Sequence, residues 1–142
     1  MTCALVLLLY GATPAIPPLT CYCGLWLLPD AVGAADHVVV GRLLQLRTLD
    51  KPPDELGYEE AVLLVEASWK GAEAGDTLTV GDPFAGTDCG AGFTLGGRFL
   101  VFARLEGARL VDLGCRSSRA LGFAAGALDS LGAPISGHWA RD

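Results

Sequence analysis

Apolar and β-branched residues gather in five short stretches along the chain, and turn-forming residues separate them. The five stretches are residues 37–46, 59–69, 77–80, 98–103 and 110–113. Prolines and glycines mark the connections at 50–55, 70–76 and 81–92, while 106–108 has the length of a tight hairpin turn. The first stretch is rich in β-branched residues, and each stretch is short and followed by turn residues, which is typical of β-strands. The pattern therefore predicts five strands, of which the first three form a meander.

Other features complete the predicted fold. Gly41 interrupts the first stretch, at a point where a barrel strand bends or bulges. Leu128 and Leu131 have helical spacing and predict a helix over 124–131 that packs against the sheet, and the small residues at 30–36 are compatible with one helical turn. We therefore expect a mainly β fold, a five-stranded Greek-key barrel of the OB type with a C-terminal helix. Its core would contain Trp69, Phe99 and Phe102, which lie within the apolar strand patterns.

The first 29 residues carry no charged side chain. Prolines at 14, 17 and 18 would break a membrane-spanning helix, which leaves 4–9 as an apolar run of the size found in signal peptides. We expect residues 1–20 to hold a signal peptide that is cleaved after Ala15 or after Thr20, followed by one domain at 21–142. The mature chain would then be secreted, extracellular or in the cell envelope, without a membrane span.

Composition and charge narrow the choice of partners. The chain has 142 residues, of which 51% are hydrophobic and 18% charged, so it can bury a core and is unlike a disordered segment. Its 10 basic and 16 acidic side chains give a net charge of −6. Nucleic acids and anionic membrane surfaces attract basic proteins, so both are poor partners for this one. A protein partner fits the composition better.

The chain contains five cysteines, Cys3, Cys21, Cys23, Cys89 and Cys115, and removal of the signal peptide leaves four. Four cysteines allow three pairings. Residues as close as Cys21 and Cys23 rarely bridge each other, so each is expected to reach Cys89 or Cys115, in either order. The spacing fits neither the paired knuckles of a structural zinc site nor a Cys-x-x-Cys redox motif. Structural disulfides that staple the barrel are the best interpretation.

No constellation of residues predicts catalysis or cofactor binding. The two histidines are His37, at a strand entrance, and His138, in the tail, and neighbours such as Asp36 and His37 point to opposite faces of a strand. The other polar candidates have ordinary structural explanations: Ser117 and Ser118 as turn residues, and Asp82, Asp88 and Asp112 as solvated carboxylates. Trp26, Trp139 and His138 receive no role. We therefore expect a protein that is not an enzyme and needs no cofactor.

A set of motifs resembles a known family. They are Cys21-Tyr22-Cys23, the segments 35–42, 69–71, 88–90 and 97–103, and Cys115. In order and separation they resemble the N-terminal domain of tissue inhibitors of metalloproteinases, which belongs to the netrin-like group of OB barrels. The resemblance extends from residue 21 to about 131. It implies disulfides that join Cys21 to Cys89 and Cys23 to Cys115.

The resemblance also implies a function. In the family's inhibitors, the first cysteine is the mature N-terminus, and its α-amino group and carbonyl oxygen chelate the catalytic zinc of a metallopeptidase. Carried over, Cys21 would be the chelator, Tyr22 would enter the specificity pocket, and Cys23 with Gly24 would complete the inhibitory ridge. Tyr22 is larger than the small hydroxyl residue usual there, and the cysteines of the family's third disulfide in this domain are missing.

The position of cleavage separates the inhibitor from the alternatives. Cleavage after Ala15 would leave five residues before Cys21 and would block the chelating amine. The chain would then be a non-inhibitory interaction module in the extracellular space or envelope, with cysteines that only staple the barrel. An envelope thiol enzyme is a third possibility, and it would require free thiols at Cys21 and Cys23.

Overall fold

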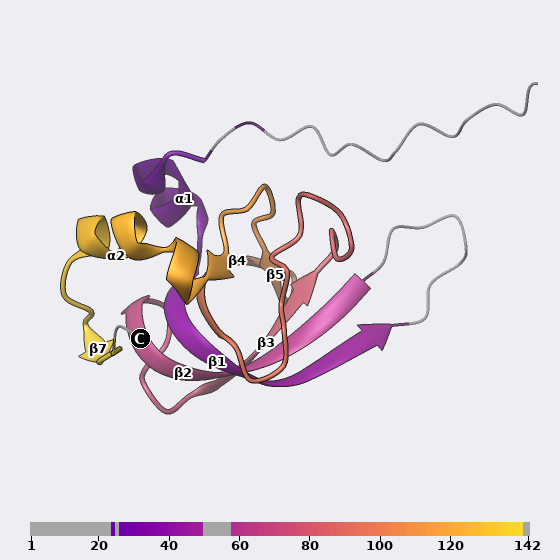
Figure 1. The fold of residues 1–142 in the computed structure, drawn as a ribbon, viewed down its shortest axis with the longest axis horizontal. Coiled ribbons are helices and arrows are strands. Elements are labelled where there is room, and N and C mark those ends of the chain that lie inside the picture. Colours follow the sequence, from indigo (N-terminus) through magenta and orange to yellow (C-terminus); the bar gives the residue numbers. More distant parts are fainter. Residues whose placement is uncertain (1–23, 25, 50–57, 141–142) are drawn as a thin grey trace, which may run out of the picture.

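The computed structural model describes residue 24 and residues 26–49 and 58–140. The elements in chain order are α1 (Leu28–Ala34), β1 (His37–Leu49), β2 (Tyr58–Lys70), β3 (Thr77–Asp82), β4 (Arg98–Glu106), β5 (Arg109–Asp112), β6 (Arg119–Ala120), the 3-10 helix η1 (Leu121–Phe123), α2 (Ala125–Leu131) and β7 (Ser136–Gly137). Figure 1 shows that the strands curve around a common centre, while the two α-helices lie to one side.

The five main strands form a closed barrel. Antiparallel pairing joins β1 to β2, β2 to β3 and β5 to β4, and a parallel pairing joins β3 to β5. The antiparallel pairing of β1 with β4, from His37↔Ala103 to Arg42↔Arg98, closes the ring. The fold is thus mainly β, with a five-stranded closed barrel and a short C-terminal helix.

The five predicted strands are present, and the first three form the predicted meander. The next strand in the barrel after β3 is β5, which pairs with it in parallel, and β4 follows β5. Strands β1 and β4 also extend beyond their predicted ends, to Leu49 and Glu106. Backbone pairing continues there although the side chains are exposed, so the apolar pattern gave no signal of it.

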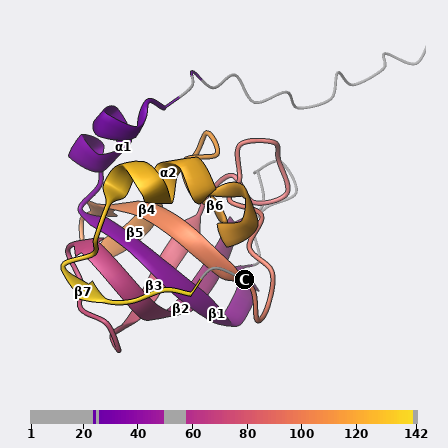
Figure 2. The ribbon, with the colours of Figure 1, turned by 60° about the vertical axis from the view of Figure 1, so that its left-hand side comes forward.

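Alternation along β1 and β4 divides the buried side chains between two clusters. Val39, Phe99 and Val101 face the barrel interior, together with Leu43, Leu63 and Val80. Val38, Val40, Leu100 and Phe102 face outward, where α1 and α2 cover them with Ala31 and Leu128. Figure 2 shows both helices on this side of the barrel. Because successive side chains of a strand point to opposite faces, these two strands are buried on both sides.

The bend predicted at Gly41 is confirmed. The register of β1 against β2 shifts between Val40 and Gly41, which marks a bulge or irregularity. A Cβ at Gly41 would lie 3.1 Å from the Cβ of Leu63 and 3.3 Å from the carbonyl oxygen of Leu64. The glycine therefore allows β1 and β2 to approach closely where the strand turns around the barrel.

The helices lie close to their predicted positions. The predicted helix at 124–131 is α2, and its Leu128 is buried. The helical turn expected at 30–36 begins two residues earlier, because Pro29 occupies the first turn, where proline is tolerated. Phe99 and Phe102 are buried as expected, Phe99 in the barrel interior and Phe102 in the outer cluster. Trp69, also expected in the core, is only half-buried on the outer cluster, where Trp26 and Trp139 also pack. Within the described residues, no helix combines the length and apolar character needed to cross a bilayer.

Candidate functional site at the cysteine-bearing end of the barrel

The predicted inhibitory segment is largely outside the described residues. Cys21, Tyr22 and Cys23 are not described, and Gly24 is exposed. Cys89 and Cys115, the predicted anchors of this segment, are described. They lie on two loops, which we call the Cys89 loop (residues 83–97) and the Cys115 turn (residues 113–118).

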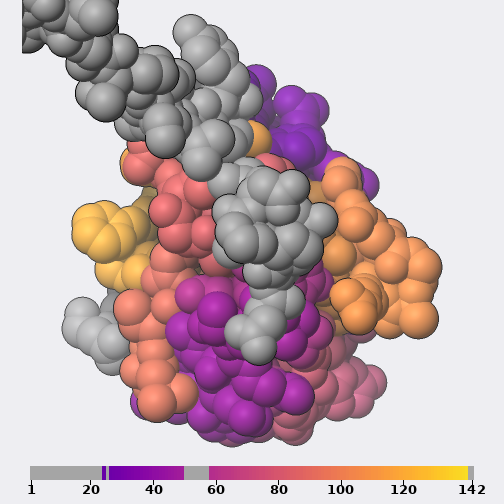
Figure 3. Space-filling model, turned by 90° about the vertical axis from the view of Figure 1, so that its right-hand side faces the viewer, coloured from indigo at the N-terminus to yellow at the C-terminus, as the bar shows by residue number. Residues whose placement is uncertain are grey.

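The parallel pairing of β3 with β5 brings the two cysteines to the same end of the barrel. Val80 pairs with Leu110 and Gly81 with Val111, so the next residues, Asp82 and Asp112, end neighbouring strands at the same level. Parallel strands leave a sheet at the same edge. The chain therefore enters the Cys89 loop and the Cys115 turn side by side. Figure 3 looks onto the barrel from the side to which β3 points in Figure 1.

Asp82 holds both ends of the segment that carries Cys89. Its Oδ1 accepts a 2.9 Å hydrogen bond from the backbone N–H of Phe84, and its Oδ2 accepts one of 2.9 Å from that of Ala91. Inside this segment, the Thr87 hydroxyl donates to the Phe84 carbonyl oxygen at 2.7 Å and accepts from the Cys89 N–H at 3.2 Å. Cys89 itself is only 2% exposed. The loop is thus a compact unit built on one carboxylate.

Asp112 holds the Cys115 turn in a similar way, through a backbone N–H of that turn. Its Oδ2 accepts a 2.8 Å hydrogen bond from the backbone N–H of Gly114. Gly114, Cys115 and Arg116 follow one another at φ values of 75°, 56° and 57°, in the left-handed region. Two of these three are not glycines, a conformation that side chains adopt at a cost and that the surroundings must hold in place. The buried carboxylate supplies one such constraint.

The two cysteine-bearing loops also contact each other directly. The Nε of Arg116 donates a 3.0 Å hydrogen bond to the backbone carbonyl oxygen of Asp88. A Cβ at Gly114 would lie 2.7 Å from the ring of Phe84, so the turn packs closely on the Cys89 loop. Cys89 and Cys115 are both disulfide-bonded. Their predicted partners, Cys21 and Cys23, lie outside the described residues, so the pairing stays a prediction.

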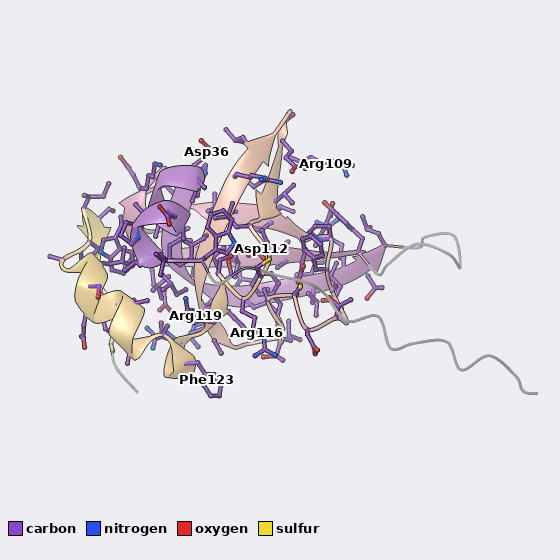
Figure 4. The ribbon with its side chains drawn as sticks, turned by 90° about the horizontal axis from the view of Figure 1, so that it is seen from above. Asp36, Arg109, Asp112, Arg116, Arg119 and Phe123 are labelled. Atoms are coloured by element: carbon purple, nitrogen blue, oxygen red, sulfur yellow. The ribbon has the colours of Figure 1, made fainter. Side chains whose placement is uncertain are left out.

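Asp82 and Asp112 are not the solvated carboxylates expected from the sequence. They are 1% and 2% exposed, although they are the last residues of β3 and β5. Burial raises the pKa of Asp112 to about 7, the nearby charge of Asp82 adds to this, and hydrogen bonds from Ser118 and Gly114 oppose it. In Figure 4, Asp112 lies within the body of the molecule, whereas Arg116 and Phe123 lie toward its edge. Asp88, by contrast, is exposed as expected.

Asp82 and Glu59, two carboxylates close to Asp112, also have raised pKa values. Burial also raises the pKa of Asp82, against hydrogen bonds from the backbone N–H groups of Ala91 and Phe84. Glu59 pairs with Asp82 across β2 and β3, and its pKa is raised by burial and then by the charge of Asp82. A sequence signal for the two aspartates existed, because Asp82 lies shortly after the apolar stretch 77–80 and before Pro83, and Asp112 lies in the stretch 110–113, shortly before Gly114.

The remaining polar candidates do not form a catalytic group. The carboxylate of Asp36 accepts a 2.7 Å hydrogen bond from the backbone N–H of Leu105, and the buried Nδ1 of His37 has no partner in the described part of the chain, so the two do not pair. Ser117 and Ser118, expected as turn residues, lie in a bend and are buried, and the Ser118 hydroxyl accepts from the Phe102 N–H at 2.8 Å. His138 is exposed near the C-terminal end.

In the part of the chain that the structure describes, no three metal-ligating side chains gather into a site. No protein-family model matches the chain, and no curated protein matches it significantly. Function is therefore inferred from the residues and from the geometry of the cysteine-bearing end.

Proposed function

We propose that this chain is a secreted inhibitor of zinc metallopeptidases, similar to the N-terminal domain of tissue inhibitors of metalloproteinases and built on an OB-type Greek-key barrel. The strand order β1-β2-β3-β5-β4, closed by the β1–β4 pairing, supports such a barrel, as does the bulge at Gly41. The helix α2 packs on the outer face of the barrel.

The observation that carries the proposal is the placement of Cys89 and Cys115. Two loops that leave neighbouring parallel strands, and that contact each other through Arg116 and Asp88, present the two cysteines at one end of the barrel. A Cys-x-Cys segment is short, so anchoring both of its cysteines requires two acceptors that lie near each other. Disulfides from Cys21 to Cys89 and from Cys23 to Cys115 would hold the segment on both sides of Tyr22.

The chemistry of inhibition follows from a segment held in this way. With Cys21 as the first residue, its uncharged α-amine and its carbonyl oxygen form a five-membered chelate on the zinc of the target peptidase. The chelate displaces the water that would attack a substrate. Tyr22 then enters the specificity pocket, and Cys23 and Gly24 continue along the cleft. Gly24 is exposed, as this role requires.

The test uses two matched chains that differ by one residue. One begins at Cys21, and the other carries an added alanine before Cys21, which removes the chelating amine and leaves the barrel unchanged. Inhibition of a panel of zinc endopeptidases by the first chain, and a loss of about a hundredfold or more in the second, is the expected result, since metal ligation supplies several kcal/mol. Equal inhibition by both chains, or none by the oxidised first chain, overturns the proposal.

A second candidate is a non-inhibitory interaction module in the extracellular space or envelope. It is favoured by the exposure of Phe123, which is 84% exposed on η1 at the edge of the molecule. Large apolar side chains at such positions are frequent anchors of protein interfaces. The two candidates differ in their mature N-terminus, because cleavage after Ala15 is compatible only with the interaction module.

A further inference from the structure

We propose that Asp82 and Asp112 act together as positioning residues for the inhibitory segment, with the ionised Asp82 fixing the Cys89 loop and Asp112 fixing the Cys115 turn in a proton-dependent way. The consequence for inhibition rests on the proposed function, whereas the effect on the two loops does not. The two aspartates are buried at matching ends of parallel strands, and each holds a loop that carries a disulfide-bonded cysteine.

The two carboxylates are not equivalent in their hydrogen bonds. Both oxygens of Asp82 accept backbone N–H groups, one from Phe84 and one from Ala91. An amide has only one acceptor oxygen, so Asn at this position would turn an NH₂ group toward an N–H donor. Among the described residues, only Oδ2 of Asp112 accepts a backbone N–H, that of Gly114, and its buried Oδ1 has no hydrogen-bond partner there. Asp112 can therefore carry a proton, or be an amide, and keep the Gly114 bond.

The surroundings of Asp112 are acidic. Asp82 faces it from β3, and Glu59 faces Asp82 from β2. From the Cys115 turn, the groups beside Asp112 are the neutral Ser118 hydroxyl and the Gly114 N–H. Ionisation of Asp112 therefore places a second negative charge next to Asp82 in a buried site, and the repulsion weakens the closure of the loops. A proton on Asp112, whose pKa burial raises to about 7, removes this repulsion.

The experiment measures how fast the disulfides of Cys89 and Cys115 are reduced by a phosphine reagent, at pH 6 and at pH 8, in the oxidised full chain. Asp82→Asn is expected to speed reduction at least about tenfold at both pH values, because a buried N–H loses its acceptor. Because the phosphine itself is a better nucleophile at the higher pH, each rate is divided by the rate for a small, unstructured disulfide at the same pH. On this relative scale, the wild-type chain is expected to be reduced several-fold faster at pH 8 than at pH 6. Asp112→Asn is expected to abolish that difference and to remain as slow as the wild type at pH 6.

Asp88→Asn is the matched control, because Asp88 is an exposed aspartate of the same loop that contacts Arg116 only through its backbone oxygen. It is expected to behave like the wild type. Reduction of Asp82→Asn at the control rate, or an Asp112→Asn variant that keeps the wild-type dependence on pH, overturns the proposal. If Asp82→Asn does not fold, the proposal is tested by comparing the pH dependence of reduction in Asp112→Asn with that in the wild type.

The same variants distinguish this proposal from the proposed function. Inhibition of a zinc endopeptidase by the Cys21 chain is measured at both pH values in parallel with reduction. If the loops respond as expected and no peptidase is inhibited, the positioning pair stands and the inhibitor proposal fails. If the chain inhibits and Asp112→Asn leaves both pH profiles unchanged, the inhibitor proposal stands and the positioning pair fails.

Discussion

The indole Nε1 of Trp69, in β2, donates a 3.0 Å hydrogen bond to the carbonyl oxygen of Gly132, which ends α2. The bond ties the C-terminal helix to the barrel, and β7 continues the attachment by pairing with β2. Trp69→Phe keeps a ring in the outer cluster but removes the donor.

We expect Trp69→Phe to lower the free energy of unfolding by about 1 kcal/mol, the net contribution of one hydrogen bond of this kind. Unfolding in urea, followed by circular dichroism, measures the change. Trp26→Phe is the control, because Trp26 packs on the same cluster without a hydrogen bond among those of the described residues. Equal destabilisation by the two substitutions would show that the bond to Gly132 contributes nothing.

Gly71 occupies a position that only glycine can fill. Its φ is 82°, and a Cβ there would lie 2.1 Å from the carbonyl oxygen of Asp36 and 2.9 Å from the Cγ of His37. Gly75, in the same connection, has a φ of 94° but open space around it.

Gly75→Ala should therefore cost about 1–2 kcal/mol for the left-handed backbone alone. Gly71→Ala should cost at least about 2 kcal/mol more, because the backbone of β1 must also move. Thermal unfolding of the two variants tests the difference. Similar melting temperatures for both would mean that the contact with Asp36 is not a constraint.

Substitutions of the two adjacent serines in the Cys115 turn are expected to have opposite effects on stability. The Ser118 hydroxyl satisfies the buried N–H of Phe102, whereas the Ser117 hydroxyl is buried without a partner among the described residues. Ser118→Ala should destabilise the chain by about 1–3 kcal/mol, since it leaves a buried donor unsatisfied. Ser117→Ala should be neutral or slightly stabilising. Chemical denaturation of both variants measures this, and a reversed order would contradict the hydrogen-bond assignment.

The buried Asp112 makes stability depend on pH. Its pKa rises from 3.8 to about 7 on folding, so the folded chain binds this proton more tightly than the unfolded chain does. The stabilisation is complete below pH 3.8 and is lost as the pH rises through 7, with a ceiling of about 4 kcal/mol for this group. The raised pKa values of Asp82 and Glu59 act in the same direction.

We therefore expect the free energy of unfolding to fall between pH 5 and pH 8, and Asp112→Asn to flatten most of that slope. Urea unfolding at several pH values measures both slopes. If the stability of the Asp112→Asn chain depended on pH as strongly as that of the wild type, a group other than Asp112 would be responsible for the dependence.

Strand positions followed from the sequence because local alternation and glycine placement determine them. The five apolar stretches and the bend at Gly41 needed no knowledge of distant contacts. The strands were expected to be antiparallel, and the parallel pairing of Val80 with Leu110 was missed, because it joins strands that are far apart in the sequence.

The buried aspartates were misjudged for a related reason. Asp82 and Asp112 look like ordinary loop carboxylates until the register of β3 and β5 places them side by side under the loops that they hold. Trp69 was similarly assigned to the barrel core, since alternation identifies two faces of a strand but not which of two clusters each face meets. The positions of Asp82, Asp112 and Trp69 depend on contacts between elements rather than on local sequence preferences.

The most direct test of the central claim is the N-terminal sequence of the exported protein together with a map of its disulfides from unreduced peptides. We predict a chain that begins at Cys21, with Cys21 bonded to Cys89 and Cys23 bonded to Cys115. A chain that begins at Ile16, or one in which Cys89 and Cys115 are bonded to each other, would contradict the account.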